Sequence, residues 1–115
     1  MPLVDVPLYV EAQAVGVAWE FKARCYVEDP AGSMNWRRGT FGEVEVVFDF
    51  LGEWWQVTQE VERKNCDANG DVIFAGQHPG GGYAMTAKHN ISGEVQKVRI
   101  DCYEDGTYTT TIEIQ

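Results

Sequence analysis

The residues of this chain that could do chemistry are three cysteines, two histidines, two serines and many carboxylates. Neither Ser33 nor Ser92 stands in the Gly-x-Ser-x-Gly context of a nucleophilic serine. The acidic residues alternate with apolar ones, as on the solvated face of a strand, and so do not suggest a catalytic pair. No two cysteines have Cys-x-x-Cys spacing, and His78 and His89 are distant in sequence from any cysteine. We therefore expect no enzyme activity, no metal and no cofactor.

Two of the cysteines, Cys25 and Cys102, have the inward parity of the strands expected to contain them. They could form a disulfide between two sheets, or they could be reduced cysteines that pack in the core as small apolar side chains. Cys66 lies at a turn and is the candidate for a free thiol. Because the number of cysteines is odd, at least one is free or pairs with another chain.

A tryptophan and two arginines in an expected loop are candidates for binding. Asn35, Trp36, Arg37 and Arg38 lie in this loop, and tryptophan and arginine are typical anchors of protein interfaces. Trp54 has the polar parity of its expected strand, where it could form a flat platform for sugars. For each tryptophan the alternative is a side chain folded under a loop or buried by a neighbouring chain.

Alternation of apolar and polar residues predicts the strands that must position these side chains. In the clearest case, residues 17–28, one face carries Trp19, Phe21, Ala23, Cys25 and Val27. The expected strands are 3–15 with an interruption at Pro7, 17–28, 40–51, 54–63, 71–75, 83–87, 94–103 and 107–114, and 34–39 is expected to be a loop. No segment has the period of a helix. Two sheets that pack their apolar faces together are the economical arrangement.

Three turn signals separate the later strands. Asn69-Gly70 predicts a two-residue type I′ hairpin, since both of its central positions need positive φ. Asp105-Gly106 predicts a second hairpin. The run from His78 to Gly82 predicts a sharp corner, because Pro79 cannot donate a hydrogen bond and glycine favours turning. A strand follows this glycine run where a phosphate-binding loop would need a helix, which argues against nucleotide binding.

The stretch from Asp67 to Ala87, D-A-N-G-D-V-I-F followed by P-G-G-G-Y-A-M-T-A, resembles immunoglobulin-like and prealbumin-like surface modules. These include bacterial Ig-like repeats of invasin-type adhesins, Cna-B-type repeats and carboxypeptidase-regulatory-like domains. The resemblance implies an all-β, two-sheet Ig-like or prealbumin-like sandwich of about 7–8 antiparallel strands, with a jelly roll as the second choice. It also implies a stalk, adhesion or accessory role without catalysis. The Lys–Asn isopeptide bond of many Cna-B modules is not expected, because no Asn follows Asn90.

The length of 115 residues predicts a single domain over 1–115, and the net charge of −9 argues against nucleic acid as a partner. No apolar run is long enough to span a membrane. The first residues do not have the pattern of a signal peptide, so the location is open, with a virion or an extracellular surface favoured. We expect a non-enzymatic structural or adhesive module, such as a virion (capsid decoration or tail) or surface-fibre component. A protein partner or self-assembly is favoured over a glycan; the alternatives are a carbohydrate-binding module using exposed tryptophans or a small protein-binding inhibitor.

Overall fold

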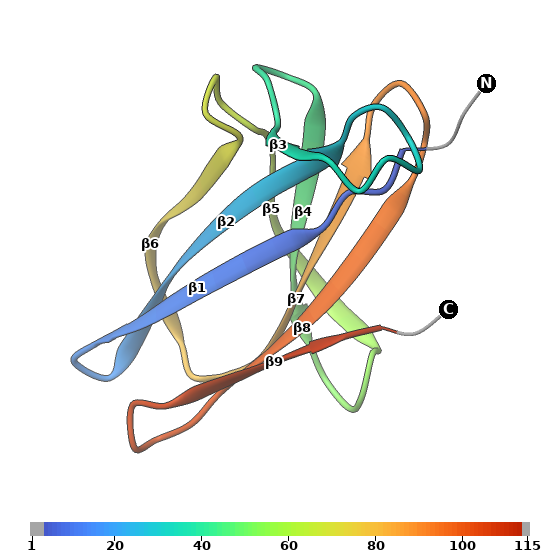
Figure 1. Ribbon diagram of the computed structural model, residues 1–115. Helices are drawn as coiled ribbons and strands as arrows, with labels where there is room; N and C mark the ends of the chain where they lie inside the picture. Colours follow the sequence, from blue (N-terminus) through green and yellow to red (C-terminus); the bar gives the residue numbers. More distant parts are fainter. Residues whose placement is uncertain (1–3, 114–115) are drawn as a thin grey trace.

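The computed structural model describes residues 4–113, and these residues form nine strands and no helix (Figure 1). The strands are β1 (Leu8–Val15), β2 (Ala18–Glu28), β3 (Trp36–Arg38), β4 (Val44–Leu51), β5 (Val57–Asn65), β6 (Asp71–Pro79), β7 (Gly81–His89), β8 (Val95–Cys102) and β9 (Tyr108–Ile112).

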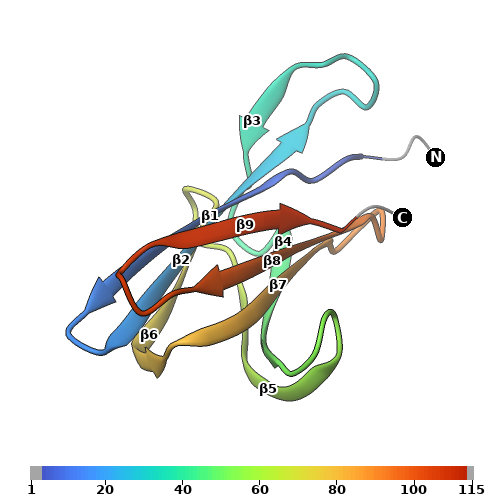
Figure 2. The same cartoon turned by 90° about the horizontal axis from the view of Figure 1, so that it is seen from below.

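The strands form two antiparallel sheets. One sheet has the order β1-β2-β3, with β6 also paired to β2, and the other has the order β5-β4-β7-β8-β9. Figure 2 shows β5 and β9 at opposite edges of the five-stranded sheet. The chain changes sheet after β3, after β5 and after β6, so residues distant in sequence meet across the core. The predicted all-β, two-sheet sandwich is confirmed.

The core forms where the predicted inward faces of the two sheets meet. All five inward residues of β2, from Trp19 to Val27, are buried as expected. Phe21 and Phe74 from one sheet pack against Phe48 and Tyr83 from the other, with ring centroids 4.8–5.1 Å apart where these rings pair. Burial of each such ring contributes about 2–3 kcal/mol, so this aromatic cluster is a main source of stability.

One local prediction, that of residues 36–38, is wrong. Trp36–Arg38, expected to be loop, is the short strand β3, because its backbone pairs with Tyr26–Glu28 at the end of β2. In β4 the pairing with β5 shifts between Phe48 and Asp49 and again between Phe50 and Leu51. Phe50 nevertheless packs against the core, with its ring centroid 5.3 Å from that of Tyr83. The edge strand β5 is exposed along most of its length, and Val61 is its residue that packs against the core.

The Asn69-Gly70 turn also differs from its prediction. The Gly70 N–H donates to the Asp67 C=O and the Asp67 N–H to the Asp71 C=O, while Gly70 alone in this turn has positive φ. This is a three-residue loop with a glycine bulge, not a type I′ turn. It joins β5 to β6 across the two sheets rather than forming a hairpin within one. By contrast, Asp105-Gly106 does join the paired strands β8 and β9.

The glycine-proline corner joins β6 to β7 and crosses between the sheets, but it is tighter than predicted, since His78 and Pro79 are paired in β6 and Gly81 and Gly82 in β7. The Tyr83 hydroxyl donates to the Pro79 C=O, four residues upstream. A tyrosine near the start of a strand that bonds back to the preceding corner is a tyrosine corner, a feature of sandwich domains. The buried hydroxyl therefore fixes the direction in which the chain enters β7, and burial raises the pKa of Tyr83 to about 12.

Candidate functional site

Four loops gather at one end of the sandwich, which we call the loop end: residues 29–35, 39–43, 66–70 and 90–94. They meet because β2, β5 and β7 finish at this end and β4, β6 and β8 begin there. In Figure 1 these loops form the upper end of the molecule. Loops held by a rigid sandwich are common binding surfaces, so their geometry is the first place to look for a site.

The carboxylate of Glu43 is the centre of the loop end. Its two oxygens accept bidentate hydrogen bonds from the Arg37 guanidinium at 2.7 and 2.8 Å. One oxygen also accepts from the Thr40 N–H at 3.0 Å, and the other lies 3.0 Å from His89 Nε2. Arg37 donates further to Asp29 at 2.8 Å. These charge-assisted bonds join the loop before β4 to the loop before β3 and to the end of β7.

The protonation states of this cluster follow from its hydrogen bonds. His89 Nδ1 accepts from the Ser92 N–H at 3.1 Å, so the ring proton lies on Nε2 and is donated to Glu43. The Arg37 guanidinium, followed by the Thr40 and His89 donors, holds the pKa of Glu43 well below its usual range. Glu43 is therefore a permanent carboxylate at neutral pH, with all of its donors supplied by the protein.

Backbone and amide bonds tie the remaining loops to this cluster. The Asn90 side chain donates to the Gly42 C=O at 2.9 Å and to Asn65 at 3.1 Å, and the Asn90 N–H donates to the Glu43 C=O. Cys66 Sγ donates to the Thr40 C=O at 3.1 Å. Three of the four loops, 39–43, 66–70 and 90–94, thus form one hydrogen-bonded frame, to which Arg37 links the fourth.

The fourth loop, residues 29–35, is ordered by a buried carboxylate. Glu28 accepts from the Gly32 N–H at 2.5 Å and from the Met34 N–H at 3.3 Å. Met34 has a φ of +64°, in the left-handed region that a residue with a side chain rarely adopts. The Glu28 bonds hold this conformation, and the Met34 side chain is directed to solvent.

Large apolar side chains stand exposed on this ordered frame. Met34 and Phe41 are each 81% exposed, and Ile91 is 76% exposed. Each of the three lies on a different loop of the loop end. None of the three was predicted from the sequence as a binding residue; the available signal was a single large apolar residue in a turn with serine or glycine nearby, S-M-N, F-G and I-S-G. The three side chains share one end of the sandwich and are open there to contact with a partner.

The predicted loop residues are here, but the arginines are not free to bind. Arg37 is held by Glu43 and Asp29, and Arg38 lies over the Tyr26 ring while it donates to Asp71 at 3.2 Å. Asn35 is exposed, and its C=O accepts from the Asp29 N–H. Trp36 is partly exposed on β3. The two arginines therefore stabilise the loop end and do not present free cations.

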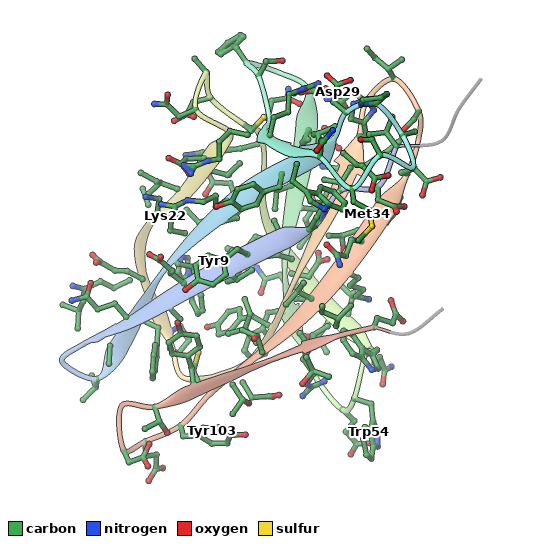
Figure 3. All side chains as sticks on the ribbon, in the orientation of Figure 1. Tyr9, Lys22, Asp29, Met34, Trp54 and Tyr103 are labelled. Carbon is green, nitrogen blue, oxygen red and sulfur yellow. The ribbon has the colours of Figure 1, made fainter. Side chains whose placement is uncertain are left out.

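Trp54 lies at the opposite end of the molecule, as Figure 3 shows by the positions of Met34 and Trp54. It sits in the β4–β5 turn with a φ of +56° and is 82% exposed, not on the polar face of a strand as predicted. The length of β4, eight residues or about 26 Å, separates this turn from the loop end. Trp36 and Trp54 therefore cannot form one shared platform.

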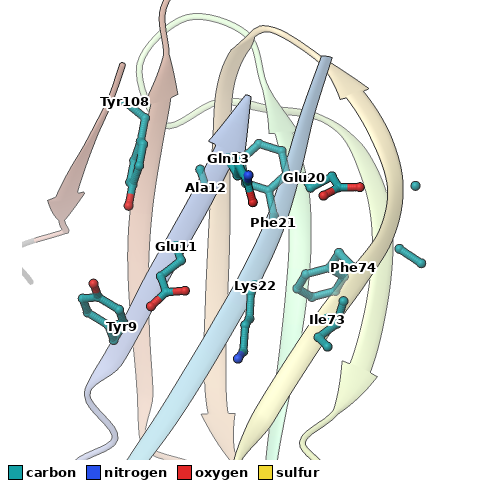
Figure 4. A pocket seen from close by; sticks show the side chains of 12 residues that line it. Tyr9, Glu11, Ala12, Gln13, Glu20, Phe21, Lys22, Ile73, Phe74 and Tyr108 are labelled. Carbon is teal, nitrogen blue, oxygen red and sulfur yellow. The ribbon is translucent and has the colours of Figure 1, made fainter. Parts of the chain in front are cut away.

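A shallow groove of about 560 Å³ lies along the four-stranded sheet and reaches Tyr108 of β9 (Figure 4). Its walls carry mixed groups from β1, β2 and β6, among them Tyr9, Glu11, Glu20, Lys22 and Ile73. The residues that line it include no serine, cysteine or histidine.

The three cysteines are free, buried thiols. Cys102 lies beside Trp19, whereas Cys25 is further along β2 by about 20 Å of strand. The disulfide considered for Cys25 and Cys102 is therefore not present, and both are reduced core residues. Burial raises the pKa of each of these two thiols to about 12. Cys66, at its turn, is also free but is only 1% exposed.

Comparison of the chain with protein-family models, with curated proteins and with solved structures finds no match. Within residues 4–113 no helix could cross a membrane. The function is therefore inferred from the geometry of the chain itself.

Proposed function

We propose that this chain is a non-enzymatic structural or adhesive module that contacts a protein partner through its loop end. The observation that carries this proposal is the exposure of Met34, Phe41 and Ile91 on loops held together by the Glu43 cluster. The partner would belong to a larger assembly, such as a virion or a surface fibre.

The chemistry of the loop end favours a protein over other ligands. When a partner buries Phe, Met and Ile side chains, binding is stabilised by about 25 cal/mol for each Å² of apolar surface removed from water. The arginines that could grip a phosphate or a carboxylate ligand are already paired within the chain. The hydrogen-bonded frame also reduces the ordering cost of binding, since the loops hold their conformation before the partner arrives.

The fold supports the same proposal. Its two sheets, β1-β2-β6 and β5-β4-β7-β8, have the strand neighbours found in Ig-like sandwiches, and Tyr83 makes a tyrosine corner. Sandwiches of this kind bind through the loops at one end, which matches the position of the exposed residues. This likeness is one of architecture and supports the proposal by analogy.

A glycan-binding role is the second candidate, and the observation that favours it is Trp54. An exposed tryptophan held at positive φ is a strained conformation, and such conformations gather at functional sites. Loss of glycan-array binding in Trp54→Ala, with binding retained in Trp36→Ala, would support this role. A folded protein that binds no glycan would leave it without support.

The protein-contact proposal is tested by size-exclusion chromatography of extracts from cells that make the protein. We expect the wild-type chain to elute in a complex larger than its own 12.9 kDa. Phe41→Asn with Ile91→Asn should release it, because both substitutions remove apolar contacts without touching the Glu43 cluster. Val17→Asn is the matched control, since Val17 is 98% exposed but lies at the opposite end. Equal behaviour of the two variants would contradict the proposal.

A further inference from the structure

The outer edge of β9 presents unpaired backbone groups in a regular row. Tyr103 and Thr107 are direct partners that share a backbone hydrogen bond, and so are Lys97 and Glu113. Hydrogen-bonded and non-hydrogen-bonded pairs alternate along an antiparallel ladder. The N–H and C=O groups of Tyr108, Thr110 and Ile112 therefore point away from β8. No strand lies beyond β9 among residues 4–113 (Figure 1).

The other long edges carry features that hinder strand addition. The β5 edge has two pairing irregularities and the charged side chains Glu60, Glu62, Arg63 and Lys64. On β1, the Leu8 N–H is already bonded to the Gln96 side chain at 2.6 Å. On β6, the Ile73 C=O accepts from Lys64. By contrast β9, Y-T-T-T-I, contains no charged residue, no proline and no irregularity.

The β9 edge leads into an acidic groove of about 390 Å³. Its apolar floor includes Trp36, Val95 and Ile112, which are 43%, 42% and 56% exposed. Three carboxylates line it, and no lysine or arginine does: Asp5, Glu94 and Glu113. The groove therefore suits an occupant with both apolar and positively charged side chains.

Charge decides between a second copy of this chain and a different partner. In a symmetric antiparallel pairing of two β9 strands about Thr110, Glu113 of one copy lies opposite Thr107 of the other. The acidic turn with Glu104 and Asp105 then approaches the groove carboxylates, which is unfavourable in a chain of net charge −9. An extended segment with lysine or arginine meets the same carboxylates favourably.

We propose that the β9 edge binds an extended segment of a partner protein, rich in lysine or arginine and alternating with apolar residues, which adds as a further strand of the five-stranded sheet. Backbone bonds to Tyr108, Thr110 and Ile112 would hold it, and the groove would select its charge. This surface is separate from the loop end, so it does not depend on the function proposed above.

The test is a titration of the intact chain with an acetylated peptide of about nine alternating lysine and valine residues, followed by NMR. We expect amide shifts centred on Tyr108–Ile112 and an affinity that falls with added salt. Thr110→Pro removes the outward N–H without breaking the ladder to β8, so it should weaken binding about tenfold or more. Thr110→Val keeps the N–H and is the matched control. Glu94→Gln with Glu113→Gln should weaken binding and reduce its salt dependence.

Two further peptides keep the test decisive if Thr110→Pro does not fold. A copy methylated at alternate backbone nitrogens, and a copy with glutamate in place of lysine, should both fail to bind the wild-type chain. Equal binding to wild type and Thr110→Pro, or to the methylated peptide, would show a non-specific ionic attraction and overturn the proposal. So would the absence of peptide binding, or a wild-type dimer that Thr110→Pro makes monomeric.

Discussion

Glu43→Gln is the most informative single substitution, because the Glu43 carboxylate accepts hydrogen bonds from three different parts of the loop end. A glutamine amide supplies one oxygen and one NH2 group. In either orientation that NH2 group faces an N–H of the Arg37 guanidinium, together with the Thr40 N–H in one case and the His89 Nε2–H in the other, and all of these are donors. At least one charge-assisted bond is replaced by a repulsive contact.

The cost of this change at neutral pH is about 2–3 kcal/mol of unfolding free energy. Hydrogen bonds to charged groups contribute about 1.5–3 kcal/mol each, and breaking a fully buried ion pair costs about 3–5 kcal/mol. The lower range applies because the Arg37 side chain is 39% exposed, although that of Glu43 is only 10% exposed.

The Glu43 carboxylate also makes the unfolding free energy depend on pH. The pKa of Glu43 is lowered in the folded chain from its ordinary value of 4.5, so its contribution is complete above that pH and is lost as pH falls. One proton changes stability by about 1.4 kcal/mol per pH unit, which gives a loss of about 2 kcal/mol between pH 5 and pH 3. Glu43→Gln has no carboxylate to protonate at this position and so does not undergo this loss. The difference in unfolding free energy between the variant and the wild type should therefore narrow to below about 1 kcal/mol at pH 3.

Urea unfolding followed by tryptophan fluorescence at pH 7 and pH 3 measures both quantities. Glu104→Gln, a change to an exposed carboxylate in the β8–β9 turn, is the matched control and should differ from wild type at neither pH. A Glu43→Gln chain within about 0.5 kcal/mol of wild type at pH 7 would refute the structural role of the cluster. A gap of equal size at both pH values would refute the assigned charge state.

Three further predictions concern the frame and the core. Gly70→Ala should lower the unfolding free energy by at least about 3 kcal/mol, because the added Cβ would lie 2.8 Å from the Gly39 nitrogen. Gly106→Ala, at a similar φ but with open space around it, should lower it by about 1 kcal/mol in the same urea assay. Equal losses in the two variants would be inconsistent with this packing. Tyr83→Phe should lower the unfolding free energy by about 1–2 kcal/mol through loss of the corner hydrogen bond, and a neutral effect would argue against that bond. The three cysteines should react with a thiol reagent at pH 8 only after unfolding, because they are buried; rapid labelling of the folded chain would disprove this burial.

The fold could be predicted because alternating apolar and polar residues identify most of its strands. Alternation in 17–28 identified the whole inward face of β2, since one polar and one apolar face specify a half-buried strand. Strand β3 could not be predicted: three residues carry no readable period, and Trp36–Arg38 is a strand only because Glu28 and its neighbours offer backbone partners. The hairpin predicted at Asn69-Gly70 was wrong because the turn propensity of these two residues does not reveal that the strands on either side belong to different sheets.

The site was predicted only in part for a related reason. Arg37 and Arg38 were identified as prominent loop residues, yet their partners Glu43 and Asp71 are found only in the folded chain. Whether an arginine binds a ligand or stabilises a loop depends on those partners, and the local sequence does not contain them. Phe41 and Ile91 were overlooked because their exposure follows from how loops 39–43 and 90–94 are held, not from their own neighbours.

The central claim, that the loop end is a protein-contact surface, is tested most directly by site-specific photo-crosslinking in cells that make the protein. A photoreactive phenylalanine analogue at position 41 or 91 should give the same discrete protein adduct, because both side chains project from one frame. The analogue at position 17, equally exposed at the opposite end, should not give it. Adducts at position 17 that match those at position 41, or no adduct at either loop position, would contradict the claim.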